Sequence, residues 1–228
     1  MIKVEITGTP LSEILKDAEK QVCYATAVAL TRTAKAVKEA MPAALERSLD
    51  RPTPFTKKGL YVRAATPSNL TAEVDFMDIQ ARYMQLQIGG GTRSPGSRGI
   101  KLPGNIVLNT FGNIPKGMID KLKAAAQSGQ LSKAIGRKLG LGNRRKGAAP
   151  IQLFFGKPIG RRWDNAPVGI WRRIPGPPGK LVPVILFEDK AAQYKPRFDF
   201  EREAGQVVQA EWTGQFDAAL AEAMGTAR

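Results

Sequence analysis

The run LVPVILF, residues 181–187, is the most hydrophobic short stretch of the chain and predicts the strand that anchors the core. Pro183 has no N–H to donate to a neighbouring strand, so it indicates either a sheet edge or a bulge early in this strand. Two further strands, VGIWRRI from Val168 and IQLFF from Ile151, come before it, and Gly176 to Gly179 predicts the turn between. The second half of the chain therefore predicts a mostly antiparallel sheet.

Helical patterns flank this region at both ends of the chain. IKVEIT at residues 2–7 alternates like a strand, and Thr9 and Pro10 then suit the cap and first position of a helix. Small and apolar residues recur every three or four positions to about Ala40, and Pro42 predicts an end or a kink. From about Phe200 a similar pattern predicts one helix, or two joined near Gly214.

The intervening residues predict further short elements. LYVRAAT from Leu60 and TAEVDF from Thr71 alternate on either side of turn-forming residues, which predicts a hairpin. MQLQIG from Met84 predicts another strand, and residues 105–109 a short one. A helix is predicted from Pro115 to about Leu131, after which the glycines at 136, 140 and 142 loosen the chain.

Residues 89–104, GGGTRSPGSRGIKLPG, break the periodicity and predict a flexible arm. The arm lacks the GxxxxGK[ST] pattern of a phosphate-binding loop, so a nucleotide site is rejected. The fold expected for the chain is α+β, a mostly antiparallel sheet packed with a long amino-terminal helix and carboxy-terminal helices, with extended basic loops. We expect a single domain over residues 1–228.

Positive charge is concentrated in the middle of the sequence. The chain has 35 Lys and Arg against 20 Asp and Glu, and residues 89–182 contain 18 of the basic residues and only 2 of the acidic ones. The densest part is the segment 136–180. The residues expected to contact a polyanion or a partner are Arg93, Arg98, Lys101, Arg137, Lys138, Arg144, Arg145, Lys146, Lys157, Arg161, Arg162, Arg172, Arg173 and Lys180.

Such a field predicts binding to a polyanion. Nucleic acid is the first candidate because each neutralised phosphate releases counterions without any need to read sequence. An acidic protein surface would serve equally well, and a solvated face that keeps the protein soluble is the remaining alternative.

The composition argues against catalysis. Histidine is absent and Cys23 is the only cysteine, so an imidazole base, the usual transition-metal ligand and an internal disulfide are all excluded. Carboxylates remain for Mg²⁺ or acid–base chemistry, namely Asp75 with Asp78, Glu188 with Asp189, and Asp164. None has a recognisable catalytic spacing, so turn capping or solvent exposure is the expected role. We expect no enzymatic activity, cofactor or metal.

Tryptophan offers one further possibility. Trp163 and Trp171 lie beside arginines, an arrangement that could stack on the bases of a single strand, whereas burial in the core or in a subunit interface is the expectation for them and for Trp212. The chain has no apolar run long enough to span a membrane and no signal-peptide pattern, so a soluble protein made in the cytoplasm is expected.

The carboxy-terminal half has a familiar order of features: GIWRR from Gly169, a Gly/Pro turn, LVPVILFEDKAAQYKPRFDF from Leu181, and a terminal amphipathic helix ending in AALAEAM. It resembles the phage minor tail protein Z and related tail-completion proteins. The alanine-rich helix YATAVALTRTAKAVKEAM from Tyr24 is similar to the opening helix of that group.

The resemblance implies a structural virion protein of a bacteriophage tail or head–tail neck, made in the host cytoplasm. It implies a ring of roughly six or twelve copies around the genome path. The partners expected from it are other copies of the chain, neighbouring tail, adaptor or portal proteins, and genomic DNA bound without sequence specificity. The alternative is a basic nucleic-acid-binding protein that acts outside a virion, and a carboxylate-dependent Mg²⁺ nuclease is the third interpretation.

Overall fold

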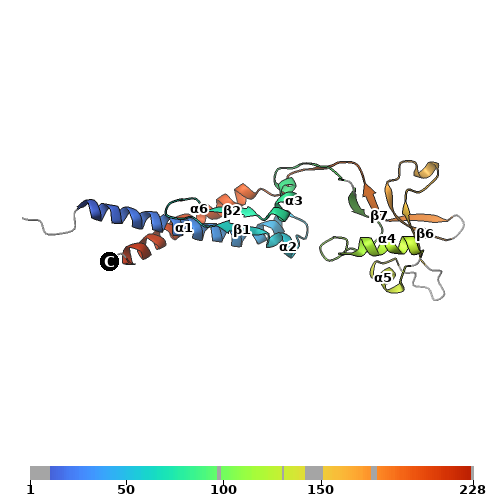
Figure 1. Ribbon diagram of the computed structural model, residues 1–228, viewed down its shortest axis with the longest axis horizontal. Helices are drawn as coiled ribbons and strands as arrows, with labels where there is room; N and C mark the ends of the chain where they lie inside the picture. The colour runs from blue at the N-terminus through green and yellow to red at the C-terminus, as the bar shows by residue number, and fades with distance from the viewer. Residues whose placement is uncertain (1–10, 97–98, 130, 142–150, 176–178, 227–228) are drawn as a thin grey trace, which may run out of the picture. The chain divides into compact units, whose positions relative to one another are not determined.

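A computed structural model describes residues 11–96, 99–129, 131–141, 151–175 and 179–226 (Figure 1). The expected α+β class is confirmed, with 48% helix and 21% strand in antiparallel sheets. The single domain expected over residues 1–228 divides into two compact units. Unit 1 consists of Met1–Gly90 with Lys195–Arg228, and unit 2 of Gly91–Tyr194.

The amino-terminal helix of unit 1, α1, spans Leu11–Ser48 and continues through Pro42. Of the two expectations for Pro42, an end of the helix is therefore wrong. Proline removes one backbone hydrogen bond from a helix, and its neighbours Met41 and Leu45 are completely buried. Burial of these two side chains offsets the missing bond and keeps the last turns helical.

The carboxy-terminal helix α6 spans Phe200–Thr226 without interruption at Gly214, so the expectation of one helix is confirmed. In Figure 1, α6 lies along α1, and the contact is made by buried alanines, Ala25 and Ala29 of α1 with Ala219 and Ala223 of α6. Alanine is the smallest side chain that still favours a helix, so this contact allows the two backbones to approach closely.

The rest of unit 1 packs on the carboxy-terminal half of α1. A short helix α2 (Pro54–Lys57) is capped by Thr53, whose hydroxyl accepts a hydrogen bond from the amide of Thr56. Strands β1 (Leu60–Arg63) and β2 (Glu73–Phe76) pair as the expected antiparallel hairpin. Their buried side chains join α1, α3 (Asp78–Ile88) and the start of α6 in one core of Val37, Met41, Ala44, Leu45, Leu60, Phe76, Met84 and Phe198.

The strand predicted for MQLQIG from Met84 is wrong, because these residues lie largely in α3. The alternation of apolar residues with glutamine suits a strand, but Gln80 and Met84 are both buried and are spaced as one helix face. The amide of Gln80 donates to the carbonyl oxygen of Phe55, which satisfies this polar group in the interior.

Unit 2 contains a four-stranded antiparallel sheet in the order β4-β7-β6-β5. The strands are β4 (Ile100–Pro103), β5 (Gln152–Gly156), β6 (Val168–Ile174) and β7 (Lys180–Glu188). The last three confirm the strands expected from IQLFF, VGIWRRI and LVPVILF. A separate pair is formed by β3 (Gly91–Arg93) and β8 (Ala192–Tyr194).

Strands β3 and β4 correct the prediction that residues 89–104 form a loop without regular structure. Each pairs with a strand about ninety or more residues later, since Ile100 is opposite Glu188 and Gly91 opposite Tyr194. Such pairing uses backbone hydrogen bonds, which glycine can make as well as any residue. The glycine and serine content of residues 89–104 therefore carries no local sequence signal for β3 and β4.

Helix α4 (Met118–Ser128) confirms the helix expected after Pro115, and it covers one face of the four-stranded sheet (Figure 1). Its Met118, Leu122 and Ala125 share a core with Leu139, Leu141, Leu153, Ile170, Val184 and Ile185. The short helix α5 (Lys133–Lys138), capped by Ser132, was not expected among the glycines. The strand predicted at 105–109 is wrong, because Asn109 Oδ1 accepts from the amides of Phe111 and Asn113 and forms a turn.

The bulge expected near Pro183 is present. β7 lies between β4 and β6, and its register with β6 shifts between Ile170, opposite Ile185, and Trp171, opposite Pro183. Val184 is the extra residue, and both Val184 and Ile185 are completely buried in the core. The bulge thus lets two successive side chains enter one core, which a regular strand would not allow.

Some expectations lie outside the described residues, namely the strand at 2–7, the cap at Thr9 and Pro10, Gly142, and most of the turn from Gly176 to Gly179. Among the residues that are described, no helix combines the length and the apolar character needed to cross a membrane.

Candidate polyanion-binding surface

The two units differ sharply in charge. Unit 2, Gly91–Tyr194, contains 19 Lys and Arg and 4 Asp and Glu, whereas unit 1 contains 16 of each. Unit 1 is therefore formally neutral, and unit 2 carries the whole net charge of +15. A surface with this excess attracts polyanions over distances of about a Debye length, roughly 8 Å at physiological salt.

Most of the predicted contact residues that the structure describes are exposed. Arg93 lies in β3, Lys101 in β4, Arg137 and Lys138 in the last turn of α5, Lys157 after β5, Arg161 in a short 3₁₀ helix η1 (Arg161–Trp163), and Arg173 and Lys180 at facing ends of β6 and β7. Arg172 is half-buried. Arg98, Arg144, Arg145 and Lys146 lie outside the described residues, as does the side chain of Arg162.

The contact residues that the structure describes do not all lie on one face of unit 2. Arg172 follows Ile170 on the face of the sheet that carries the α4 core, and the neighbouring Arg173 points to the other face. There the guanidinium of Arg173 lies 5.2 Å from the centre of the Phe154 ring, an arrangement that covers the ring and orients the cation. The described basic residues thus lie on both faces of the sheet of unit 2 rather than in one pocket.

Arg173 and Lys180 come together at a shallow hollow of about 410 Å³ formed by the ends of β6 and β7. Gln152, Leu181 and Pro175 complete part of its wall. Two cations at an apolar hollow suit an anionic group carried on a larger ligand.

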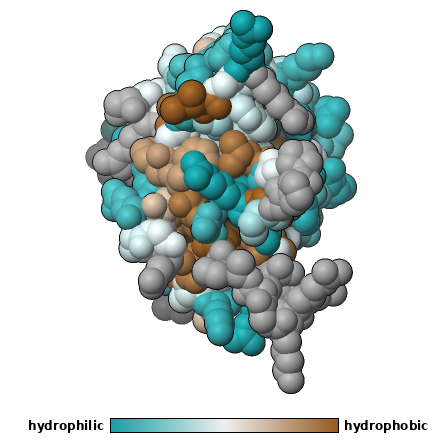
Figure 2. Space-filling model, turned by 90° about the vertical axis from the view of Figure 1, so that its right-hand side faces the viewer, coloured by the Kyte–Doolittle hydropathy of each residue, from teal (hydrophilic) through white to brown (hydrophobic). Residues whose placement is uncertain are grey.

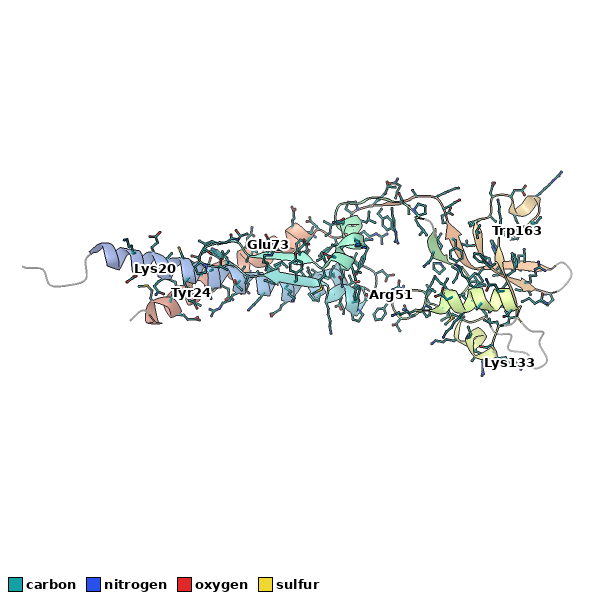
Figure 3. The ribbon with its side chains drawn as sticks, in the orientation of Figure 1. Lys20, Tyr24, Arg51, Glu73, Lys133 and Trp163 are labelled. Atoms are coloured by element: carbon teal, nitrogen blue, oxygen red, sulfur yellow. The ribbon has the colours of Figure 1, made fainter. Side chains whose placement is uncertain are left out.

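The residues between β5 and β6 form a loop that is held by two tryptophans. Trp171 is buried at 2% exposure, and its indole N–H donates to the carbonyl oxygen of Gly156 at 3.1 Å. Trp163, labelled in Figure 3, is half-buried and packs edge-on against Trp171 with 5.3 Å between the ring centres. Trp212 stacks on Phe216 inside unit 1. The three indoles therefore stabilise the fold, and Trp171 is not available to stack on a base.

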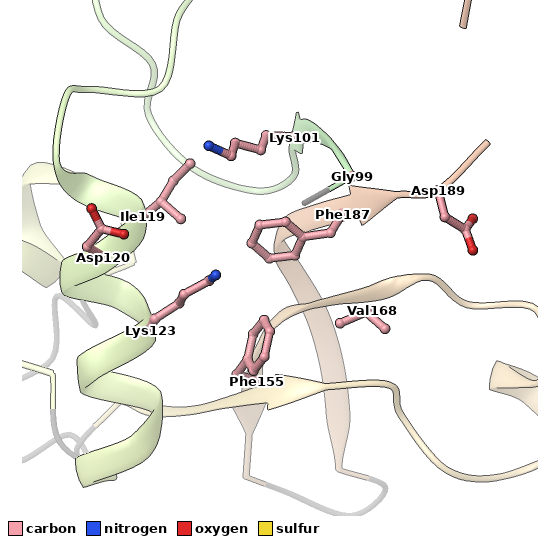
Figure 4. A pocket seen from close by; sticks show the side chains of 9 residues that line it. All are labelled: Gly99, Lys101, Ile119, Asp120, Lys123, Phe155, Val168, Phe187 and Asp189. Atoms are coloured by element: carbon pink, nitrogen blue, oxygen red, sulfur yellow. The ribbon is translucent and has the colours of Figure 1, made fainter. Parts of the chain in front are cut away.

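A cleft of about 610 Å³ lies between α4 and the sheet (Figure 4). Lys123 reaches over its floor, with Nζ 4.9 Å from the ring centre of Phe187 and 5.1 Å from that of Phe155. Lys101 also lines the cleft, as do Asp120 and Asp189. The cleft combines two ammonium groups, two carboxylates and two rings, so no single ligand charge is favoured.

Among the carboxylates considered for catalysis, Asp189 lines the cleft beside α4, and the other four make local backbone contacts or lie at helix ends. Asp75 Oδ1 accepts from the amide of Phe76, Asp78 lies in the first turn of α3, and Glu188 Oε1 accepts from the amide of Lys190. Asp164 caps η1 at its carboxyl end. In the described parts of the chain, no three acidic or thiol side chains gather as a metal site.

The pKa shifts that stand out belong to ion pairs of unit 1. Hydrogen bonds from the Arg32 guanidinium lower the pKa of the Glu222 carboxyl, and those from Arg202 and Arg47 lower the pKa of Glu203. The Arg51 guanidinium lowers the pKa of Asp50 in the same way. These groups join helices or neighbouring residues, so the shifts indicate structural pairs.

Two residues of unit 2 were not identified from the sequence as candidate functional residues. Lys123 carries no signal in the sequence, because only packing places it over two aromatic rings. Ile159 does carry a sequence signal, since it is an aliphatic residue within the basic run KPIGRR, Lys157 to Arg162.

Comparisons with protein-family models, with curated proteins and with solved structures found no match to this chain.

Proposed function

We propose that this chain is a structural virion protein of a bacteriophage tail or head–tail neck, in which unit 1 associates with proteins and unit 2 faces a polyanion along the genome path. The observation that carries the proposal is the division of one chain into a neutral unit and a unit of charge +15. A conduit for DNA needs both properties, since subunits must bind one another while their charge is compatible with the nucleic acid.

Exposed apolar side chains support the role of unit 1 in protein association. Its large apolar side chains with substantial exposure are Val22, Tyr24, Phe55, Leu70, Met77, Ile79, Val208 and Met224. Tyr24 also lines a hollow of about 340 Å³ formed by α1 and the residues after β1. Aromatic and methionine side chains are enriched in protein interfaces, where burying them supplies most of the binding energy.

The resemblance to tail-completion proteins in the carboxy-terminal half supports the same proposal. Its quoted residues fold as β6, β7, β8 and α6, so they contribute to both units. A ring component can use such a continuous segment to link its contact with neighbours to its contact with DNA.

A nucleic-acid-binding protein that acts outside a virion is the second candidate, favoured by the exposure of Lys157, Arg161, Arg173 and Lys180. The two functions differ in assembly. A virion component forms a ring-sized oligomer or remains a monomer that binds DNA weakly, whereas a free binder is a monomer that forms a salt-sensitive complex.

The test is the mass of the full chain by light scattering after size exclusion, at low and high salt, alone and with duplex DNA. A ring-sized mass at both salt concentrations supports the virion proposal. A monomer that binds duplex tightly at low salt and releases it at high salt supports the second candidate. Tyr24→Ser and Val208→Ser test the exposed apolar surface of unit 1. If unit 1 mediates association, these variants have a lower mass in solution than the wild type. Deletion of residues 89–104 is unsuitable, because it removes β3 and β4.

A further inference from the structure

Ile159 is the most exposed large apolar residue that the structure describes. Its exposure is 97%, against 63% for Ile79, which comes next. It lies in the short connection between β5 and η1, on unit 2. Figure 2 shows hydrophobic side chains exposed among hydrophilic ones on one side of the molecule. A single exposed aliphatic side chain is ordinary on a protein surface, so the case for a binding role rests on the loop that presents Ile159 and on the cations beside it.

The loop holds Ile159 outward by contacts on both sides. Before it, the Gly156 carbonyl oxygen accepts from Trp171, and Pro158 is buried. After it, the amide of Trp163 donates to the carbonyl oxygen of Gly160 at 2.7 Å. Gly160 has φ 119°, a conformation that a residue with a side chain rarely adopts. The side chain is therefore presented by a defined loop.

Lys157 and Arg161 flank Ile159 at two residues on either side, and both are exposed. Neither makes an ion pair within the described part of the chain. Four residues of chain span at most about 14 Å, so both cations can reach phosphates on either side of one base step. The single acid of the loop, Asp164, follows η1.

Duplex DNA suits this arrangement better than the other polyanionic surfaces. One aliphatic side chain is too small an anchor for a lipid membrane, which requires a larger apolar area or a second signal. An acidic protein surface complements the charge of unit 2, 19 basic and 4 acidic residues, but it would also have to supply an apolar pocket that fits Ile159. DNA offers a uniformly negative backbone, and the faces of its stacked bases are an apolar surface that aliphatic side chains of other proteins enter.

We propose that Ile159 is a wedge that inserts at a base step of duplex DNA while Lys157 and Arg161 contact the flanking phosphates. The wedge rests on the polyanion contact in the proposed function, and it adds the ligand, the residues and the mode of binding. Unstacking one step costs free energy, so binding is tighter where a mismatch has already weakened the stack.

The test compares fluorescence anisotropy of the full chain on two labelled duplexes of about 20 base pairs, one perfect and one with a central mismatch. The wild type binds the mismatched duplex several-fold more tightly. Ile159→Ser reduces this preference to about onefold and leaves the salt dependence unchanged. The exposure of Ile159 makes misfolding of this variant improbable on physical grounds, and circular dichroism checks it. Val107→Ser, at another exposed apolar residue of unit 2, is the matched control and keeps the preference.

The double substitution of Lys157 and Arg161 to glutamine tests whether these side chains contact the DNA phosphates. It lowers the slope of log affinity against log salt by about two, and the mismatch preference remains. Equal affinity of the wild type for the two duplexes overturns the wedge, even if binding is salt-dependent as the proposed function requires. An Ile159-dependent affinity for phosphatidylglycerol vesicles with no mismatch preference also overturns it. Absence of any duplex binding contradicts both the wedge and the DNA contact, and the light-scattering mass still tests assembly.

Discussion

The indole N–H of Trp171 in β6 donates a hydrogen bond of 3.1 Å to the carbonyl oxygen of Gly156 at the end of β5. This bond joins β5 and β6 at the base of the loop that contains Ile159, and Trp163 packs on the same indole. A tryptophan that resembled a base-stacking residue in the sequence thus holds the loop that carries the exposed isoleucine.

Replacement of Trp171 by phenylalanine keeps an aromatic ring in the core but removes the donor. We expect unit 2 to lose about 1–3 kcal/mol, because the Gly156 carbonyl oxygen loses its partner and the smaller ring leaves space beside Trp163. The measurement is hydrogen exchange of the amides from 152 to 174, which becomes faster. Trp212→Phe in unit 1 is the control, and it leaves exchange in this segment unchanged. Unaltered exchange in Trp171→Phe would show that the bond does not stabilise the loop.

Replacement of Gly169 by alanine tests the packing of the same strand. An added Cβ would lie 2.7 Å from the carbonyl oxygen of Ile185 and 2.9 Å from Trp171 Nε1, closer than real contacts allow. We expect a loss of about 1–3 kcal/mol from overpacking, measured by urea unfolding.

Gly214→Ala is the matched control, since nothing lies within 4 Å of its added Cβ in α6. Alanine has the higher helix propensity, so this variant gains about 0.5–1 kcal/mol. A Gly169→Ala variant as stable as the wild type would refute the crowding argument.

The ion pair between Arg32 and Glu222 predicts a pH dependence of unit 1. Arg32 donates two hydrogen bonds to Glu222, of 3.0 and 2.8 Å, which join α1 to α6. Hydrogen bonding from Arg32 lowers the pKa of this carboxyl below its ordinary value of 4.5 in the folded protein. The pair therefore stabilises the fold above the unfolded pKa, and this contribution is lost as the pH falls through the folded pKa.

The comparison of wild type with Glu222→Gln checks this sign. The wild type melts at a higher temperature at pH 6, and the difference shrinks once the pH has fallen below 4.5 and continues through the lowered pKa of the folded protein. Salt at 1 M shrinks the difference at pH 6, because both partners are partly exposed. A difference that grew on acidification would contradict the assignment.

Replacement of Pro42 by alanine tests the helix that continues through proline. Alanine restores the amide that can donate to the carbonyl oxygen of residue 38, so we expect unit 1 to gain about 1–3 kcal/mol. The thermal midpoint measures the gain. Ala43→Pro, at an exposed neighbour, is the opposite control and lowers it. A loss in Pro42→Ala would show that the ring packs usefully against unit 1.

The sequence predicted the elements whose periodicity is long or strongly apolar, namely α1, α4, α6 and the strands β5, β6 and β7. It failed where two periods fit the same residues. Residues 84–88 alternate like a strand. They form a helix because Gln80 and Met84, which share one helix face, are buried in the core of unit 1. It failed also at Gly91 and Ile100, whose strand partners are about ninety or more residues away.

The candidate site shows the same division. The positions of charged residues along the sequence were enough to locate the basic region, because the charge of a segment does not depend on its fold. It could not separate Arg172, half-buried on the core face, from Arg173 on the opposite face, because the strand pleat sets that difference.

The sequence by itself determined the charge of the basic region, the helix-forming ends and the apolar strands, since these depend on residue type and local spacing. Tertiary structure alone decided that Val184 and Ile185 both enter the core, that Lys123 lies over Phe155 and Phe187, and that Ile159 remains in water. These features depend on contacts between residues far apart in the chain, and burial is a property of the folded surface rather than of the residue.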